Sequence, residues 1–136
     1  MANPPWWEEL VAVSDVLRDA DRAEVERWRR PGEVEDEDDV PPVTIRLGSA
    51  AHVYAEHAAG FTEEQTRRLF RLLEELLEKG GDDGDAVATG FFEALLNAWD
   101  NGFDLNAVWP EVGPEARAYC RAWNDFTGVG TPGWMR

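Results

Sequence analysis

The segment from Thr62 to residues 80–81 constrains the fold most, because all its local signals specify one α-helix. Gln65 follows Thr62 by three residues, which is the spacing of a capping box. Two glycines after Lys79 end the helix. Between these ends, leucines recur every three or four residues and form one broad apolar face (Leu69, Leu72, Leu73, Leu76, Leu77). A helix with such a face packs against other elements, so the segment predicts a helical domain.

The N-terminal half shows further apolar residues at helical spacing. A stripe that begins at Trp6 predicts either one bent helix or two short ones, ended by residues 31–32 (Pro-Gly). Residues 43–45 (VTI) could form a short extended piece. Ser49 has the side chain of a helix N-cap, which predicts a helix over residues 50–59.

The C-terminal half continues the same pattern. We expect a turn at residues 82–85 to lead into a helix, and Asp104 to cap a short helical turn. Residues 113–114 (Gly-Pro) start the last helix, whose apolar stripe runs to Phe126. Residues 129–136 form a tail that either folds back onto the core or stays loose. We therefore expect a single all-α domain spanning residues 1–136, a compact bundle of five or six helices with short loops and one acidic loop.

Negative charge is concentrated in two parts of the chain. The 136 residues include 28 acidic and 13 basic side chains, for a net charge of −15, and residues 33–40 and 82–136 carry most of the excess. Residues 33–42 end in Pro-Pro and are expected to form the exposed acidic loop. Nucleic acid and anionic membranes are excluded as expected partners, because both are bound through basic residues. A basic protein fits the charge, and the alternative is that the acids keep a small domain soluble.

The location expected from the sequence is the cytoplasm. The N-terminus lacks the basic and apolar regions of a secretory signal, and no segment approaches the roughly 20 apolar residues of a membrane span. Cys120, the single cysteine, cannot form an internal disulfide and suits a reducing compartment as a small buried side chain.

Two patterns resemble metal sites without meeting their requirements. His52, Glu56 and His57 imitate a zinc motif, but five residues of helix place the two histidines on different faces. Asp100, Asp104 and Glu111 match three positions of a calcium loop that lacks its required glycine. We expect no metal and no cofactor. An enzyme with a site assembled around His52 or His57 remains an alternative.

Six of the seven tryptophans divide into two groups, and Trp28 follows the apolar stripe of the first helix more loosely. Trp99 and Trp123 lie on apolar stripes and are expected in the core. Four others lie near chain ends or turns, where an indole can be half exposed (Trp6, Trp7, Trp109, Trp134). Such rings either pack the chain ends onto the core or serve as anchors for a partner.

Residues 88–96 (ATGFFEALL), residues 112–119 (VGPEARAY) and Trp123 resemble a family of small helical bacterial proteins of unknown function. Its members carry a Phe-Leu-Glu-Ala/Asn-Leu segment and then Leu-Gly-Pro-x-Ser before an aromatic helix. Some of them resemble immunity proteins, which neutralise toxins of interbacterial competition. The resemblance covers residues 41–128 and implies a fold without catalytic residues. This chain departs from the pattern at Phe92, Val112 and Ala116.

The sequence favours a non-enzymatic acidic protein, an immunity-type inhibitor that occludes a basic toxin, which could be one that acts on nucleic acid. The runner-up is an adaptor or regulatory helical domain whose acidity serves solubility. The residues expected to contact the partner are mostly acidic, with one aromatic anchor (Glu33, Glu35, Asp36, Glu37, Asp38, Asp39, Asp100, Asp104, Trp109, Glu111).

Overall fold

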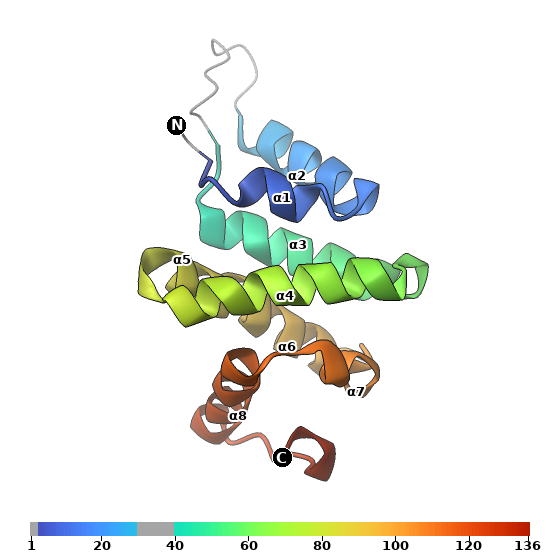
Figure 1. Ribbon diagram of the computed structural model, residues 1–136, viewed down its shortest axis with the longest axis vertical. Helices are drawn as coiled ribbons and strands as arrows, with labels where there is room; N and C mark the ends of the chain where they lie inside the picture. The colour runs from blue at the N-terminus through green and yellow to red at the C-terminus, as the bar shows by residue number, and fades with distance from the viewer. Residues whose placement is uncertain (1–2, 30–39) are drawn as a thin grey trace.

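The computed structural model describes residues 3–29 and 40–136, which contain helices and turns and no strand. The prediction of an all-α bundle is confirmed. The helices are stacked along the long axis of the molecule, from α1 and α2 at one end to α8 at the other, with α3 and α4 between them (Figure 1).

The N-terminal stripe forms two helices rather than one bent helix. Helix α1 (Trp7–Val11) is short, with five residues, and α2 (Asp15–Trp28) follows it after a break. The break occurs at Ser14, whose extended backbone and hydroxyl cap α2 by accepting a hydrogen bond from the Val16 N–H.

Helix α3 (Val43–His57) begins earlier than its sequence suggests, and a 3₁₀ turn, η1 (Ala58–Gly60), extends it. The prediction of an extended piece at residues 43–45 was wrong, and so was the prediction of Ser49 as an N-cap. Pro42 occupies the N-cap position instead, and its carbonyl accepts hydrogen bonds from the N–H groups of Ile45 and Arg46. Packing of α3 against α2, η2 and α6 outweighs the weak helix preference of the β-branched residues in its first turn.

Helix α4 (Glu63–Lys79) agrees with the prediction at both ends. The Thr62 hydroxyl accepts from the Gln65 N–H, and the Gln65 side chain accepts from the Thr62 N–H, so the capping box is complete. Gly80 ends the helix with a φ of 70°, a conformation that favours glycine. The leucine face is buried, apart from the partly buried Leu77.

Residues 81–100 form one continuous helical run, so the turn expected at residues 82–85 is absent. The run consists of α5 (Gly81–Ala86), a π-helical segment η2 (Val87–Phe92) and α6 (Glu93–Asp100). Aspartates in the first turn of α5 are favourable beside the positive end of the helix dipole. Glycine at position 90 lets α3 approach η2 closely, because a Cβ there would lie 2.6 Å from the Thr44 carbonyl oxygen.

The C-terminal part contains α7 (Leu105–Val108), the 3₁₀ turns η3 (Trp109–Glu111) and η4 (Gly133–Met135), and α8 (Pro114–Thr127). Asp104 caps α7 as predicted, through its contact with the Ala107 N–H. The tail folds back, since the Met135 side chain is fully buried and the Trp134 ring meets the Trp99 and Trp109 rings edge to face. Its ordered position shows that the tail is part of the bundle.

One hydrophobic core runs through the described helices. Its aromatic centre lies between α3, α4 and η2, where the Tyr54 ring meets the Phe70 ring edge to face with centroids 5.5 Å apart. None of the helices in residues 3–29 and 40–136 has the length and apolar character needed to cross a bilayer.

Candidate functional site

The structure separates the residues predicted to bind a partner. Residues 33–39, which include the acidic run, lie outside the described residues. Asp104 is engaged as the cap of α7, and Glu111 forms an ion pair with Arg67 at 3.7 Å. Asp100 is exposed and lines a pocket between α6 and α8. Of the predicted residues, the pocket between α6 and α8 therefore includes Asp100.

Trp109 is a correction to the sequence analysis, because its side chain is only 5% exposed. It packs beneath the Arg117 guanidinium, 5.3 Å from the ring centroid, and against the Trp134 ring. Trp6 and Trp7, for which the sequence left core packing and partner binding as alternatives, are buried as well. These rings attach chain ends and turns to the core, so they are not available as anchors for a partner.

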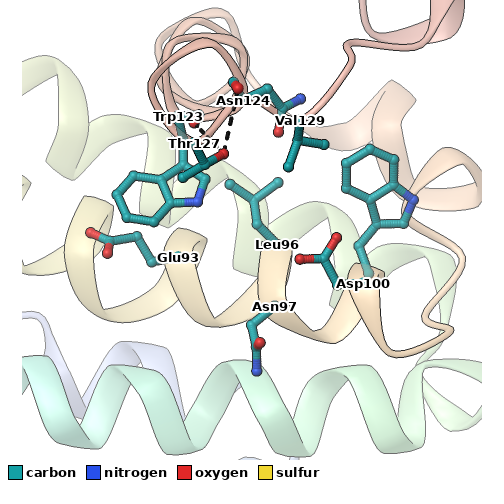
Figure 2. A pocket seen from close by; sticks show the side chains of 9 residues that line it. Glu93, Leu96, Asn97, Asp100, Trp123, Asn124, Thr127 and Val129 are labelled. Atoms are coloured by element: carbon teal, nitrogen blue, oxygen red, sulfur yellow. Dashed lines mark hydrogen bonds between the residues drawn. The ribbon is translucent and has the colours of Figure 1, made fainter.

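The pocket between α6 and α8 has a volume of about 230 Å³. Figure 2 shows Leu96 in its centre, Trp123 on one side, and the carboxylates of Glu93 and Asp100 at different positions around it. The lining comes from α6 over its whole length, from the C-terminal part of α8 and from the residue that follows the α8 C-cap (Glu93, Leu96, Asn97, Trp99, Asp100, Trp123, Asn124, Thr127, Val129). The pocket thus combines apolar, polar amide and acidic groups.

The electrostatics of this pocket favour a cation. Both helices end at its edge, and the C-terminal end of a helix carries partial negative charge. Neither α6 nor α8, both fully described, has a basic residue in its last turn, and Asp100 and Asp125 add negative charge there. Acidic side chains are unfavourable at the C-terminal end of a helix, where basic side chains are preferred. The site therefore has negative charge from two sources, the helix ends and the carboxylates, without a basic residue in the last turn of either helix.

The aromatic groups at the pocket are more exposed than the apolar stripe of α8 predicts. Phe126, expected on the buried side, is 81% exposed, and its ring lies against that of Trp123 with centroids 5.9 Å apart. Trp99 and Trp123, expected in the core, are only partly buried. Val129 is a further exposed apolar side chain. The stripe of α8 therefore extends past the core onto the surface.

Tyr119 fixes one of the two carboxylates that line the pocket. Its hydroxyl donates a hydrogen bond of 2.8 Å to the Glu93 Oε2. Burial raises the pKa of Tyr119 well above its usual value, and the hydrogen bond and the charge of Glu93 raise it further. The phenol therefore stays protonated and remains a donor that orients Glu93.

Sequence reasoning missed most of the pocket. Asn97 and Val129 belong to no motif, Glu93 falls in the segment that carries the family resemblance but has no role assigned by it, and only the fold brings the three together. Two local signals were present: acidic residues without a base near the ends of α6 and α8, and a phenylalanine at the end of an apolar stripe. These signals indicate an unusual surface but do not show that the two helix ends meet.

A second hollow, of about 450 Å³, lies between α3 and α6 beside His52. Glu56 lies one helical turn after His52, and Asn97 of α6 and its C-cap residue Asn101 line the other side. All four side chains are exposed to solvent. His57 is not part of this lining, so the structure does not bring the two histidines into one site.

Cys120 is buried in the core as predicted. Burial raises the pKa of its thiol from 9.0 to about 12. The side chain is therefore a thiol rather than a reactive thiolate at neutral pH.

We expect the stability of the protein, relative to a Cys120→Ala variant, to fall as the pH rises above about 9. Between pH 9.0 and about 12 the unfolded chain ionises the thiol, whereas the folded chain keeps its proton. The unfolded state then binds fewer protons, so the free energy of unfolding falls by about 1.4 kcal/mol per pH unit relative to the variant. Urea unfolding of both proteins across this range measures the difference, and parallel pH profiles would contradict it.

No protein-family model, curated protein or solved structure matches this chain.

Proposed function

We propose that this protein is a non-enzymatic acidic binding protein that inhibits a basic protein by covering its active site, as an immunity protein does to a toxin. The observation that carries the proposal is the surface at the ends of α6 and α8. There the partly buried Trp123 ring lines one pocket with the carboxylates of Glu93 and Asp100, and the exposed Phe126 ring lies against the Trp123 ring. Aromatic anchors surrounded by polar groups are typical of the energetic centre of protein interfaces.

The net charge of −15 supports a basic partner in two ways. Complementary charge raises the rate of encounter, and it disfavours acidic competitors. An enzyme that acts on nucleic acid has a basic active site, because it must hold phosphates. A toxin of that class would therefore be a suitable target for occlusion.

The hollow beside His52 gives less support for an enzymatic function. Catalytic acids and bases usually work where burial and neighbouring groups tune their protonation. His52 and Glu56 are both exposed, and they line an open surface between α3 and α6. The α6–α8 surface is consequently the better basis for a function.

The proposal predicts that Phe126→Ser abolishes capture of a basic partner without affecting the fold. The ring is 81% exposed, so its loss removes an anchor and little core packing. Tagged wild-type protein, Phe126→Ser and the control Ile45→Ser are compared in a lysate of the source cells at about 0.15 M salt and again at about 1 M. Ile45 is an exposed apolar residue on α3 and serves as the matched control.

We expect the wild type and Ile45→Ser to retain one basic protein in a fixed ratio. Its binding should weaken at the higher salt, and Phe126→Ser should not retain it. Retention of the same proteins by all three baits would contradict the role of this surface. If no basic protein is retained by the wild type, the acidity is better explained by the solubility of an adaptor domain.

A further inference from the structure

We propose that the α6–α8 pocket binds the side chain of an arginine from the partner protein. The proposal rests on the proposed function and specifies what the partner inserts at the centre of the interface. It follows from four features of the pocket: its charge, its aromatic wall, its size and the local cost of Asp100.

The charge of the pocket selects a cation. Glu93 and Asp100 line it, and the negative ends of α6 and α8 meet at its edge. No basic side chain is present among the lining residues, all of which are described. A cation that enters would therefore find carboxylates that no basic residue of the lining neutralises.

The aromatic wall favours arginine over lysine. A planar guanidinium can stack on an indole while its N–H groups reach carboxylates to either side, whereas an ammonium is a compact, strongly hydrated charge. The indole of Trp123 faces the space between the helices, with Glu93 and Asp100 to either side of Leu96 (Figure 2). The pocket offers both parts of this arrangement.

The protein already contains two arginines that lie over tryptophan rings, and one of them also pairs with a carboxylate. Arg46 lies 4.4 Å from the Trp7 ring centroid and forms a bidentate pair with Asp21. Arg117 lies over Trp109 and donates to a backbone carbonyl of the same residue. The α6–α8 pocket has a tryptophan and carboxylates without the arginine, and a partner can supply it.

The size of the pocket fits one side chain. Its volume of about 230 Å³ is below the roughly 300–1,000 Å³ of typical small-molecule sites. Asn124, which is 2% exposed and lines the pocket, is packed into the molecule as part of α8. The lining is therefore held by packed helices rather than by a loop, which lowers the cost of ordering on binding.

Asp100 destabilises the end of α6, and an inserted cation would remove this unfavourable interaction. It is the last residue of α6, where a carboxylate meets the negative end of the helix dipole. Asp100→Asn is therefore expected to leave the fold intact while it weakens the site. This property makes it a suitable test variant.

The test is a titration of ¹⁵N-labelled protein with the peptide acetyl-Gly-Arg-Gly-amide, followed by NMR. A single side-chain contact binds weakly, so peptide concentrations up to about 20 mM are used. Two matched peptides carry lysine or the neutral isostere citrulline in place of arginine. We expect the indole N–H signals of Trp123 and Trp99 to shift with the arginine peptide in a saturable manner, and not with the citrulline peptide.

Asp100→Asn is expected to weaken this binding about tenfold, as loss of a hydrogen bond between charged groups does. Trp123→Leu is expected to weaken it about threefold through the lost cation–π contact. Asp82→Asn, which removes an exposed acid on α5 outside the pocket, is expected to leave it unchanged. Far-UV circular dichroism checks that each variant is folded.

The arginine site is overturned if the signals of Trp123 and Trp99 do not shift, if Asp82→Asn weakens binding as much as Asp100→Asn does, or if the lysine peptide binds equally well. The peptide titration and the capture experiment can fail independently of each other. Peptide binding without a retained partner supports the site and contradicts the inhibitor function. A retained partner that is insensitive to Asp100→Asn supports the function and overturns the site.

Discussion

Replacing Glu74 with alanine is expected to lower the free energy of unfolding by about 3 kcal/mol, because a buried carboxylate caps a helix that has no cap of its own. The N-cap residue of α8, Gly113, has no side chain to accept a hydrogen bond. Glu74 reaches from α4, and its two carboxylate oxygens accept from the N–H groups of Glu115 at 2.8 Å and Ala116 at 2.9 Å. Its removal leaves two N–H donors without acceptors where water has little access.

The cap that Glu74 supplies to α8 also predicts the effect of a substitution at Gly113. A Cβ at this position would lie 2.3 Å from the Glu74 Cδ, so Gly113→Ala forces the carboxylate away from the helix end. Gly113→Ala is expected to be strongly destabilising in the wild type and nearly neutral in the Glu74→Ala background, because the clash and the cap are then already absent. Urea unfolding of the four proteins gives the coupling. Additive effects would contradict this account, and Glu75→Ala, an exposed neighbour on α4, is the control.

The second large effect is expected at Arg46, whose side chain is only 3% exposed. Its guanidinium donates to both carboxylate oxygens of Asp21 and to the Asn3 side chain at 2.6 Å, and it lies over the Trp7 ring. The Trp7 indole N–H donates to the same aspartate. This network joins the N-terminal segment, α1, α2 and α3.

Arg46→Leu is expected to cost about 3 kcal/mol or more, because it leaves the Asp21 carboxylate without its buried partner. Removing both charges in Arg46→Leu/Asp21→Leu should recover part of the loss, since an unpaired buried charge costs more than an absent pair. Thermal and urea unfolding test both variants. The control is Arg18→Leu, which breaks an exposed ion pair with Glu8 and is expected to cost less than about 1 kcal/mol. An equal loss in the two single variants would contradict the role of the network.

The sequence determined the elements that rest on local interactions. The capping box at Thr62, the glycine end of α4 and the Asp104 cap were predictable because their partners lie within four residues. The start of α8 was predictable for the same reason, since proline suits the first helical position. The all-α class followed from the spacing of apolar residues.

Tertiary packing decided the points on which the sequence analysis was wrong. Residues 43–45 are helical because α3 is packed against three other elements, and residues 82–85 continue into a long helical run. Trp109 is buried under an arginine eight residues away, and Phe126 is exposed because the end of α8 extends past the core. Neither the burial of Trp109 nor the exposure of Phe126 can be predicted from the periodicity of one helix, since both depend on where the neighbouring elements end.

The candidate site shows the same division. The sequence alone showed the excess of acidic residues and singled out Asp100, but it did not place this residue in one pocket with Trp123, because the two lie on different helices. Likewise, the cap that Glu74 supplies to α8 spans 41 residues of chain. Local hydrogen bonds and helical periodicity are encoded over a few residues, whereas pockets and long-range caps depend on the three-dimensional crossing of helices, and that crossing was decided by the tertiary structure.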